Sequence, residues 1–328
     1  MSRHARTGNA DRASALGWQN RLVRDLTVDS GGVRLAVRDF GGAGEPLVLL
    51  HGLGRTLVDW SVIGPLLAEH HRVVAFDIRG HGASDDGPWA WESAVADIDA
   101  VAHDLGLDAR SVVGHSLGGM LAVMWGRAHP NAKGVVNVDG HGRRLPAEYV
   151  GIDAEDVRRR VAESDGRVKA SLAALAGPLP PPVIDGLLSQ QRALAARFGA
   201  PEAMFVESIK RTLATEPDGQ TFLRPSPTGL GGRILADAEA LDMYQLYETV
   251  SCPVLVIAGT EPDPGADPEL MAAYRKGLRM DLEQLAREQS NITVKFIAGG
   301  HGLLFEQPDR LANLTMAFLD TKEHHAHA

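Results

Sequence analysis

Short apolar runs, bounded by glycine and polar residues, recur along most of the chain. They cover residues 46–50, 73–76, 111–114, 134–138 and 253–258; residues 292–297, which include Thr293 and Lys295, form a further predicted strand. Continuous runs of this length are typical of strands that are buried on both faces of a parallel sheet. Ahead of them, residues 26–40 alternate around Gly31 and Gly32, which predicts an antiparallel hairpin.

Helical periodicity separates most of these runs, with apolar residues returning every three or four positions. The predicted helices cover residues 57–70, 94–105, 120–124, 268–287 and 308–319. Strands that alternate with helices predict an α/β fold built on a mostly parallel, doubly wound sheet. Ligands of such sheets bind beyond the carboxyl ends of the strands, so we expect the chemistry where strands end.

The alternation stops between residues 140 and 250. This stretch is helical in character, and proline-rich segments at 177–182 and 225–232 interrupt it without a strong strand. We interpret it as a helical cap lying over the strand ends. The predicted organisation is a flexible arm at 1–22, a core at 23–144 and 246–322, a cap at 145–245 and a flexible tail at 323–328.

The run that ends at Gly114 leads through His115-Ser116-Leu117-Gly118 directly into a helical pattern. Strand, sharp turn and helix are the context of a G-x-S-x-G nucleophile elbow. The turn strains the backbone of Ser116 and needs the space that Gly114 and Gly118 leave on either side. We therefore predict that Ser116 is a nucleophile and that the N–H of Leu117 faces an oxyanion.

Two further turns follow strands. His51-Gly52-Leu53-Gly54 comes directly after the run at 46–50, so the N–H of Leu53 can serve the same oxyanion. His301, framed by glycines after the last predicted strand, has the position of the general base, in the chain order serine, acid, histidine.

These patterns do not decide which carboxylate is the acidic residue that accompanies Ser116 and His301. Asp139 ends the run at 134–138, whereas Glu261 and Asp263 follow the next strand at 253–258. A carboxylate at either place can lie behind His301. An aspartate after the earlier strand also has a purely structural interpretation.

Other residues are expected around the substrate. Apolar cap residues such as Met204 and Phe205 favour a medium-sized, apolar small-molecule substrate if they line the pocket. The residues expected at the pocket are Gly52, Trp89, Trp91, His115 and His141.

The composition excludes several classes of protein. The 328 residues suit one large α/β domain with an insertion, and 44% hydrophobic residues permit a sizeable core. A net charge of −9 argues against nucleic acid or an anionic membrane as the main partner. The single cysteine, Cys252, excludes internal disulfides and cysteine-based metal sites.

No segment has the features of a membrane span or a signal peptide, so we expect a cytoplasmic protein. No phosphate-binding loop, dinucleotide fingerprint or H-E-x-x-H segment is present, so neither a cofactor nor a metal is expected. A homodimer is compatible with this sequence, which does not determine the oligomeric state.

Taken together, the serine elbow, the His51 turn, the late histidine and the cap resemble the α/β-hydrolase family over residues 26–319. In that family the acid most often follows the later strand, three residues after a glycine. Pro262 occupies that position here, and Asp263 is displaced by one residue. A minority, including zearalenone lactone hydrolases, carry the acid after the earlier strand, which matches Asp139. The departure at Pro262 favours Asp139.

The resemblance implies acyl transfer to Ser116, with His301 as the base and water attacking the acyl-enzyme. Serine at the elbow argues against haloalkane dehalogenases and epoxide hydrolases, which resemble this chain but use aspartate there. An ester, lactone or thioester substrate is therefore predicted. Carbon–carbon bond hydrolysis and cofactor-free perhydrolysis use the same triad, and a small-molecule receptor can be built on this fold. These alternatives stay open.

Overall fold

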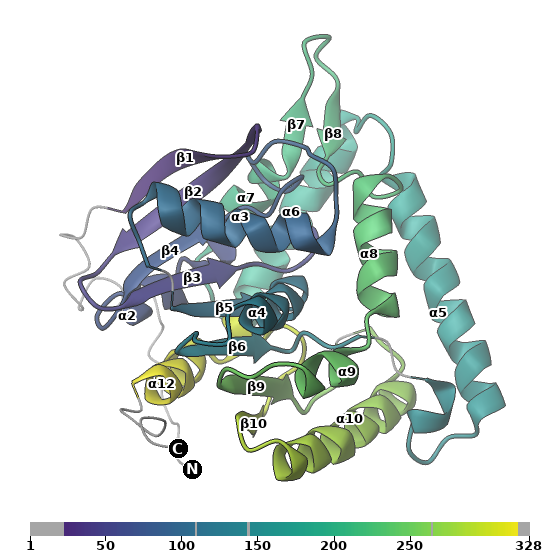
Figure 1. The fold of residues 1–328 in the computed structure, drawn as a ribbon. Coiled ribbons are helices and arrows are strands. Elements are labelled where there is room, and N and C mark those ends of the chain that lie inside the picture. Colours follow the sequence, from purple (N-terminus) through teal and green to yellow (C-terminus); the bar gives the residue numbers. More distant parts are fainter. Residues whose placement is uncertain (1–22, 109, 143–144, 264, 321–328) are drawn as a thin grey trace, which may run out of the picture.

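The computed structural model describes residues 23–108, 110–142, 145–263 and 265–320. The predicted arm at 1–22 and tail at 323–328 lie outside the described residues. Within them, the centre of the molecule is an eight-stranded sheet of order β1-β2-β4-β3-β5-β6-β9-β10 (Figure 1). Its strands are β1 (Arg24–Ser30), β2 (Val33–Gly41), β3 (Pro46–Leu50), β4 (Arg72–Phe76), β5 (Ser111–His115), β6 (Gly134–Val138), β9 (Val254–Gly259) and β10 (Ile292–Ile297).

The six strands from β4 to β10 in this order run parallel, and only β2 pairs antiparallel with β1 and β4. The predicted hairpin and every predicted strand are present. Because parallel strands present their carboxyl ends at one edge, the turns after β3, β5, β6, β9 and β10 come together there. This is the edge at which the sequence predicted the chemistry.

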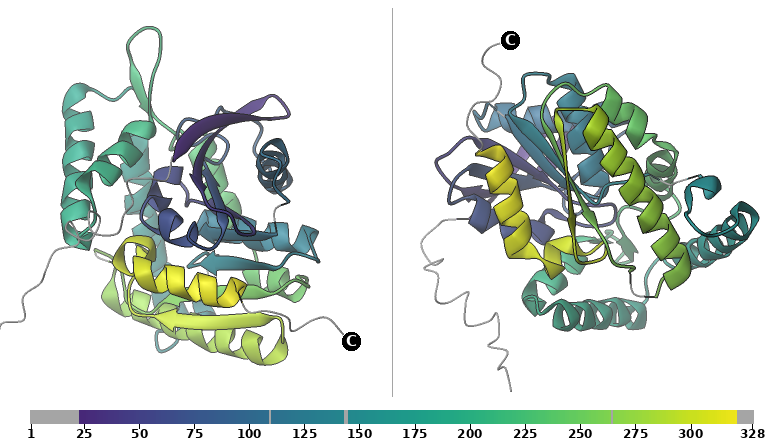
Figure 2. Two further views of the ribbon diagram at one scale, coloured as in Figure 1. Left: turned by 90° about the vertical axis from the view of Figure 1, so that its left-hand side faces the viewer. Right: turned by 90° about the horizontal axis from the view of Figure 1, so that it is seen from below.

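Helices cover both faces of the sheet, as the two further views show (Figure 2). The apolar runs divide by alternation: Val48 and Leu50 of β3 belong to one core cluster, and Leu47 and Leu49 belong to the other. The first face is covered by α3 (Trp91–Asp104), α4 (Leu117–Ala128), α9 (Met243–Glu248) and α10 (Pro268–Glu288). The second face is covered by α2 (Ile63–Leu67), α11 (Leu303–Glu306) and α12 (Pro308–Leu319).

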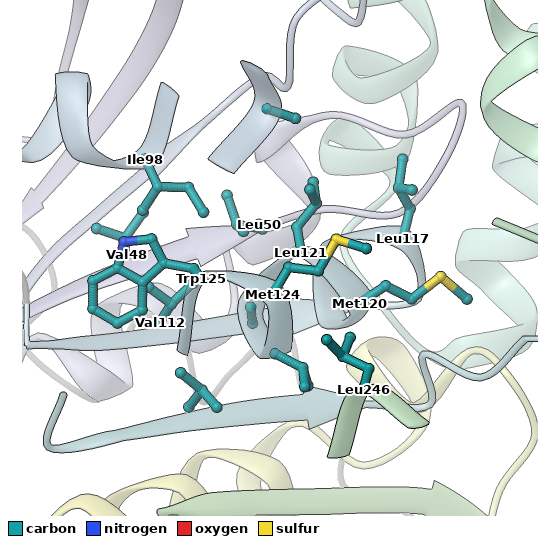
Figure 3. Packing of buried hydrophobic residues seen from close by; sticks show 14 of the residues in the cluster. Val48, Leu50, Ile98, Val112, Leu117, Met120, Leu121, Met124, Trp125 and Leu246 are labelled. Carbon is teal, nitrogen blue, oxygen red and sulfur yellow. The ribbon is translucent and has the colours of Figure 1, made fainter. Parts of the chain in front are cut away.

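Helix α4, which begins directly after Ser116, lies at the centre of the first cluster. Figure 3 shows Leu121, Met124 and Trp125 of this helix packed against Val48 and Val112 of the sheet. Almost every residue of α4 is buried. The helix that follows the elbow is therefore anchored by its apolar packing on the sheet.

Two predictions of local structure were wrong in detail. The helix expected at 57–70 is divided into a 3-10 turn, η2 (Leu57–Trp60), and the short α2. Pro65 lies in α2 and has no N–H to continue a helix from Ser61, which accounts for the break. The insertion, expected without a strong strand, contains a small hairpin of β7 (Leu213–Thr215) and β8 (Thr221–Leu223).

The rest of the insertion is helical, and Arg211 and Arg224 connect it to buried groups of the core. Its other elements are η3 (Pro146–Glu148), α5 (Ala154–Ala174), α6 (Pro181–Phe198), α7 (Glu202–Arg211) and α8 (Leu230–Ala240). The Nε of Arg211 donates to the buried Oδ2 of Asp77 at 2.6 Å. Arg224 donates to the carbonyl oxygens of Gly82 and Ser84. Charged hydrogen bonds to buried acceptors are among the stronger ones, so these contacts fix the insertion on the sheet.

Candidate active site

Ser116 lies at the turn between β5 and α4, with φ of 55° and ψ of −119°. A positive φ at a residue with a side chain is strained, and here the surrounding packing enforces it. A Cβ on Gly114 would lie 1.9 Å from the carbonyl oxygen of Gly118, and one on Gly118 would lie 2.4 Å from that of Leu50. Only glycine fits at both positions, so this sequence can form the elbow.

The side chains of Ser116, His301 and Asp139 form one hydrogen-bonded chain. The Oγ of Ser116 is 3.0 Å from Nε2 of His301, and Nδ1 of His301 is 2.8 Å from Oδ2 of Asp139. The three residues come from the turns after β5, β10 and β6. The ionised carboxylate can only accept, so Nδ1 of His301 carries the proton and Nε2 is free to accept from Ser116.

Asp139 is held by its own turn. Its φ is 50°, and its N–H donates to the carbonyl oxygen of Ile257 at 2.8 Å. The side chain of Asn137 closes the turn, because it accepts from the N–H of Gly140 and donates to the carbonyl oxygen of the same residue. These hydrogen bonds hold the turn so that the Asp139 carboxylate lies at the strand ends and faces His301.

Four donors surround that carboxylate, whose side chain is only 2% exposed. Oδ1 accepts from Nη1 of Arg275 at 2.7 Å and from the N–H of Gly259 at 3.0 Å. Oδ2 accepts from His301 and from Nη2 of Arg275 at 3.1 Å. Burial alone would raise the pKa of Asp139, but the hydrogen bonds and charges of His301 and Arg275 hold it well below its ordinary value of 3.8. Asp139 is therefore ionised at neutral pH.

The other two candidate acids do not reach the imidazole. Oδ1 of Asp263 accepts from the main-chain N–H of His301 at 2.6 Å, so Asp263 holds the loop and not the ring. Glu261 is exposed, and its N–H donates to the carbonyl oxygen of Gly299. The turn that Pro262 occupies thus directs both carboxylates away from Nδ1 of His301.

The protonation of His301 depends on opposing influences. Burial lowers its pKa, but the hydrogen bond and charge of Asp139, together with the charge of Asp263, outweigh burial and raise the pKa above 6.5. The ring of His115 lies beside it, with ring centroids 4.8 Å apart, and its Nε2 donates to the carbonyl oxygen of His301. Burial lowers the pKa of His115 to about 4, so this neighbour is neutral and adds no charge.

The turn after β3 lies against the elbow. A Cβ on Gly52 would be 3.2 Å from that of Ser116, and Leu53 and Leu117 both border the cavity beside Ser116. Nδ1 of His51 donates to the carbonyl oxygen of Gly52 at 2.7 Å, while its Nε2 accepts from the N–H of Ile78. Because a trans peptide directs its N–H opposite to its C=O, this contact fixes the direction of the Leu53 N–H.

A cavity of about 350 Å³ opens above the Ser116 hydroxyl. Its polar wall includes His141, one of the expected pocket residues, whose Nε2 is 3.8 Å from Oδ1 of Asp139. Its apolar wall comes from the turn after β3, the elbow with α4, the insertion and α10. The apolar and aromatic lining residues are Leu53, Leu117, Met120, Tyr149, Leu235, Ala238, Met271 and Tyr274.

The other expected pocket residues do not line this cavity. Trp89 donates from Nε1 to Asp237 at 3.1 Å, and it packs with Trp91 against the core on the side of α3. Gly52 and His115 lie behind Ser116, where they support the two turns. For these four residues the prediction of a place in the pocket was wrong, because sequence position does not show which side of a turn faces the hollow.

The apolar cap residues expected at the substrate have a different place too. Met204 and Phe205 are buried in the second core cluster, where Phe205 contacts Phe305, with ring centroids 4.9 Å apart. Arg275 was not among the residues predicted at the site. A signal for it exists, since Arg275 falls on the apolar stripe of Leu278 and Leu282 of α10, an unusual position for a charge.

The described part of the chain contains no group of three or more histidine, cysteine, aspartate or glutamate side chains that could hold a metal ion. None of its helices is long and apolar enough to cross a membrane. The buried Cys252 contacts the carbonyl oxygen of Gly126, and burial raises the pKa of its thiol to about 11, so it is unreactive at neutral pH.

Comparison with known proteins places this site in a family. The model of the alpha/beta hydrolase family matches residues 47–314. The chain is 32% identical over 131 residues to the N-formylmaleamate deformylase of Pseudomonas putida, covering 38% of this chain and 49% of that protein. It is 30% identical over 135 residues to 2-hydroxy-6-oxononadienedioate/2-hydroxy-6-oxononatrienedioate hydrolase 1 of Dechloromonas aromatica, covering 38% and 46%. The matches thus span about half the length of these curated relatives.

Comparison with solved structures covers a larger share of the chain. The crystal structure of E-2-(acetamidomethylene)succinate hydrolase superposes with a TM-score of 0.65 at 20% sequence identity, covering 92% of this chain and 100% of that one. At this identity the likeness concerns the fold alone. The family match over most of the chain, together with the serine elbow and the parallel sheet, leads to one conclusion: the chain belongs to the alpha/beta hydrolase family.

Proposed function

We propose that this protein is a serine hydrolase that cleaves an ester, lactone or thioester through an acyl-enzyme on Ser116. The observation that carries the proposal is the unbroken chain of hydrogen bonds from Ser116 through His301 to Asp139, at the floor of a cavity. An activated serine needs a base within hydrogen-bond reach and a third group that orients the base. The distances of 3.0 Å between Ser116 and His301 and 2.8 Å between His301 and Asp139 support these roles.

In the proposed reaction, His301 accepts the proton of Ser116 as Oγ attacks the carbonyl carbon. The tetrahedral oxyanion lies between the N–H groups of Leu53 and Leu117, the second of which is the first of helix α4 and has no partner within the helix. His301 then donates its proton to the leaving group. Water, deprotonated by the same imidazole, attacks the acyl carbon and restores Ser116.

The cavity supports a substrate of modest size with an apolar acyl or leaving group. A volume of about 350 Å³ lies at the lower end of the range for small-molecule sites. Leu235 and Ala238 come from the insertion, and Met271 and Tyr274 come from α10. We infer that the insertion at 145–245 acts as a cap that selects substrates, since one wall of the cavity is built from it.

A panel of p-nitrophenyl esters, aryl lactones and acyl thioesters tests the proposal, with a serine-reactive phosphonate as the probe of the nucleophile. We expect hydrolysis of at least one class, and stoichiometric phosphonate labelling that peptide mass spectrometry locates on Ser116. The Ser116→Ala variant is the matched control and must neither react with the phosphonate nor turn over. Labelling at another serine, or activity that survives in this variant, would disprove the proposed mechanism.

A second candidate, carbon–carbon bond hydrolysis, is favoured by one specific observation. The Dechloromonas aromatica relative is named for a 2-hydroxy-6-oxononadienedioate, a compound with a ketone at carbon 6. The Ser116 hydroxyl, with His301 as the base, is suited to attack such a ketone. Release of a carboxylic acid from a 2-hydroxy-6-oxo dienoate, without activity on the ester panel, would replace the first proposal with this one.

A further inference from the structure

Arg275 forms an ion pair with the same carboxylate that orients His301. Its Nη1 and Nη2 bind one oxygen each of Asp139, at 2.7 Å and 3.1 Å, from a residue 136 positions further along the chain. The Arg275 side chain is 8% exposed and lines the cavity. Folding therefore encloses a full positive charge beside the carboxylate that contacts the imidazole, and general requirements of a serine–histidine pair do not explain it.

The pairing uses every acceptor position of the carboxylate. An ionised carboxylate offers about four lone-pair positions. Here Arg275 fills two of them, the N–H of Gly259 fills a third and Nδ1 of His301 fills the fourth. Without the guanidinium, one donor would remain on each oxygen, and the carboxylate could rotate about its Cβ–Cγ bond. The planar fork of arginine locks that rotation in a way that a single ammonium group cannot.

The charges around His301 come from every element packed against it. The ionisable groups nearest to its main chain and ring are His115 of β5, Asp139 after β6, Asp263 before α10, Arg275 of α10 and Glu306 of α11. Those that line the cavity around it are His141, Tyr149, Glu239 and Tyr274. In these two sets Arg275 is the one arginine, and the carboxylates all favour a protonated His301. Arg275 opposes them, since its charge lowers the pKa of His301.

We propose that Arg275 is a positioning residue that fixes the Asp139 carboxylate for His301 and offsets its charge, so that the imidazole stays neutral at the pH of catalysis. The proposal rests on the proposed serine mechanism. A general base works best when its pKa is near the operating pH. An unopposed, desolvated aspartate would raise the basicity of His301 and leave it protonated and inactive. Arg275 thus makes the protonated form of His301 less stable, and a larger fraction of the enzyme carries the neutral imidazole that catalysis needs.

The test compares Arg275→Gln, which removes the charge, with Arg275→Lys, which keeps the charge and loses the fork. Arg279→Gln is the matched control, because Arg279 lies one turn further along α10, is 50% exposed and stacks over Phe296. The pKa of His301 is measured by NMR titration of the imidazole in each full-length protein, with its signal assigned from a His301→Gln variant. The kcat and KM are measured against pH on the best substrate of the panel.

We expect Arg275→Gln to raise the pKa of His301 by on the order of one unit and to move the acid limb of kcat/KM to higher pH by the same amount. Arg275→Lys should leave that pKa within a few tenths of wild type, while its plateau kcat falls about tenfold at unchanged KM. Arg279→Gln should match wild type in every measurement.

Two results would overturn the proposal. One is a folded Arg275→Gln protein whose His301 titrates as in wild type, which would leave Arg275 as a structural counter-charge only. The other is an Arg275→Lys protein with wild-type kcat and wild-type His301 pKa. The titration needs no substrate, so it decides the role of Arg275 even if the chain hydrolyses none of the panel. Failure of the proposed function is therefore distinguishable from failure of this inference.

Discussion

Replacing Asp139 by asparagine should abolish turnover through a reversal of the histidine tautomer. Each oxygen of the Asp139 carboxylate faces two donors, but the two pairs differ in whether a donor can become an acceptor. Oδ1 faces two strong donors, Nη1 of Arg275 and the N–H of Gly259, whereas Oδ2 faces Nη2 of Arg275 and Nδ1 of His301. The guanidinium and the main-chain N–H at Oδ1 can only donate, whereas His301 can change tautomer and accept, so an asparagine places its carbonyl oxygen at the Oδ1 position. Its NH₂ group then faces His301.

That orientation of the asparagine determines how much kcat is lost. An NH₂ group at 2.8 Å from Nδ1 makes this nitrogen an acceptor, so the proton moves to Nε2. Nε2 then donates to Ser116 instead of accepting from it, and the imidazole cannot act as the base. A wrong tautomer of this kind in a serine protease triad costs on the order of 10⁴ in kcat. We expect a loss of similar size here, about 5 kcal/mol in the barrier.

The assay is kcat on the best ester of the panel at a pH one to two units above the pKa of His301, with a thermal melt to verify folding. Asp263→Asn is the matched control. Its carbonyl oxygen can still accept from the N–H of His301, so we expect less than a tenfold loss. A folded Asp139→Asn protein with more than a tenth of wild-type kcat would refute the tautomer argument. The reverse ranking of the two variants would make Asp263 the acid.

Other predictions concern the nucleophile, the base, the elbow and the cap. Ser116→Ala should lose turnover and phosphonate labelling while its melting temperature stays near wild type; residual kcat above a tenth would contradict this. Because neutral His301 is required and its pKa is raised, kcat/KM should fall as pH drops through a value above 6.5, and a profile flat from pH 8 to pH 5 would exclude His301. Gly118→Ala places a Cβ 2.4 Å from a main-chain oxygen, so both stability and kcat should fall sharply in melts and assays. Leu235→Trp should reduce the rate on bulky esters far more than on acetates, whereas unchanged selectivity would show that the insertion does not shape the site.

The sequence by itself determined the sheet and the position of the elbow. Apolar runs predicted every central strand, because a strand that is buried on both faces of the sheet turns few side chains towards water. Ser116 was identifiable since its strained backbone needs glycine at fixed neighbouring positions, a requirement that lies within five residues. His301 followed from its place after the last strand. Each of these features depends on local sequence or on the common edge of parallel strands.

Only the tertiary structure decided which carboxylate faces His301, what lines the cavity and where Arg275 lies. Asp139 and Asp263 both follow strand ends, and their roles separate only because one turn directs its side chain to Nδ1 and the other to the main-chain N–H. Arg275 reaches Asp139 across 136 residues, through the packing of α10 on the sheet. Side-chain direction at the end of a turn and contacts between distant elements depend on the packing of the whole chain. The hydrophobic periodicity of the sequence carries no information about either.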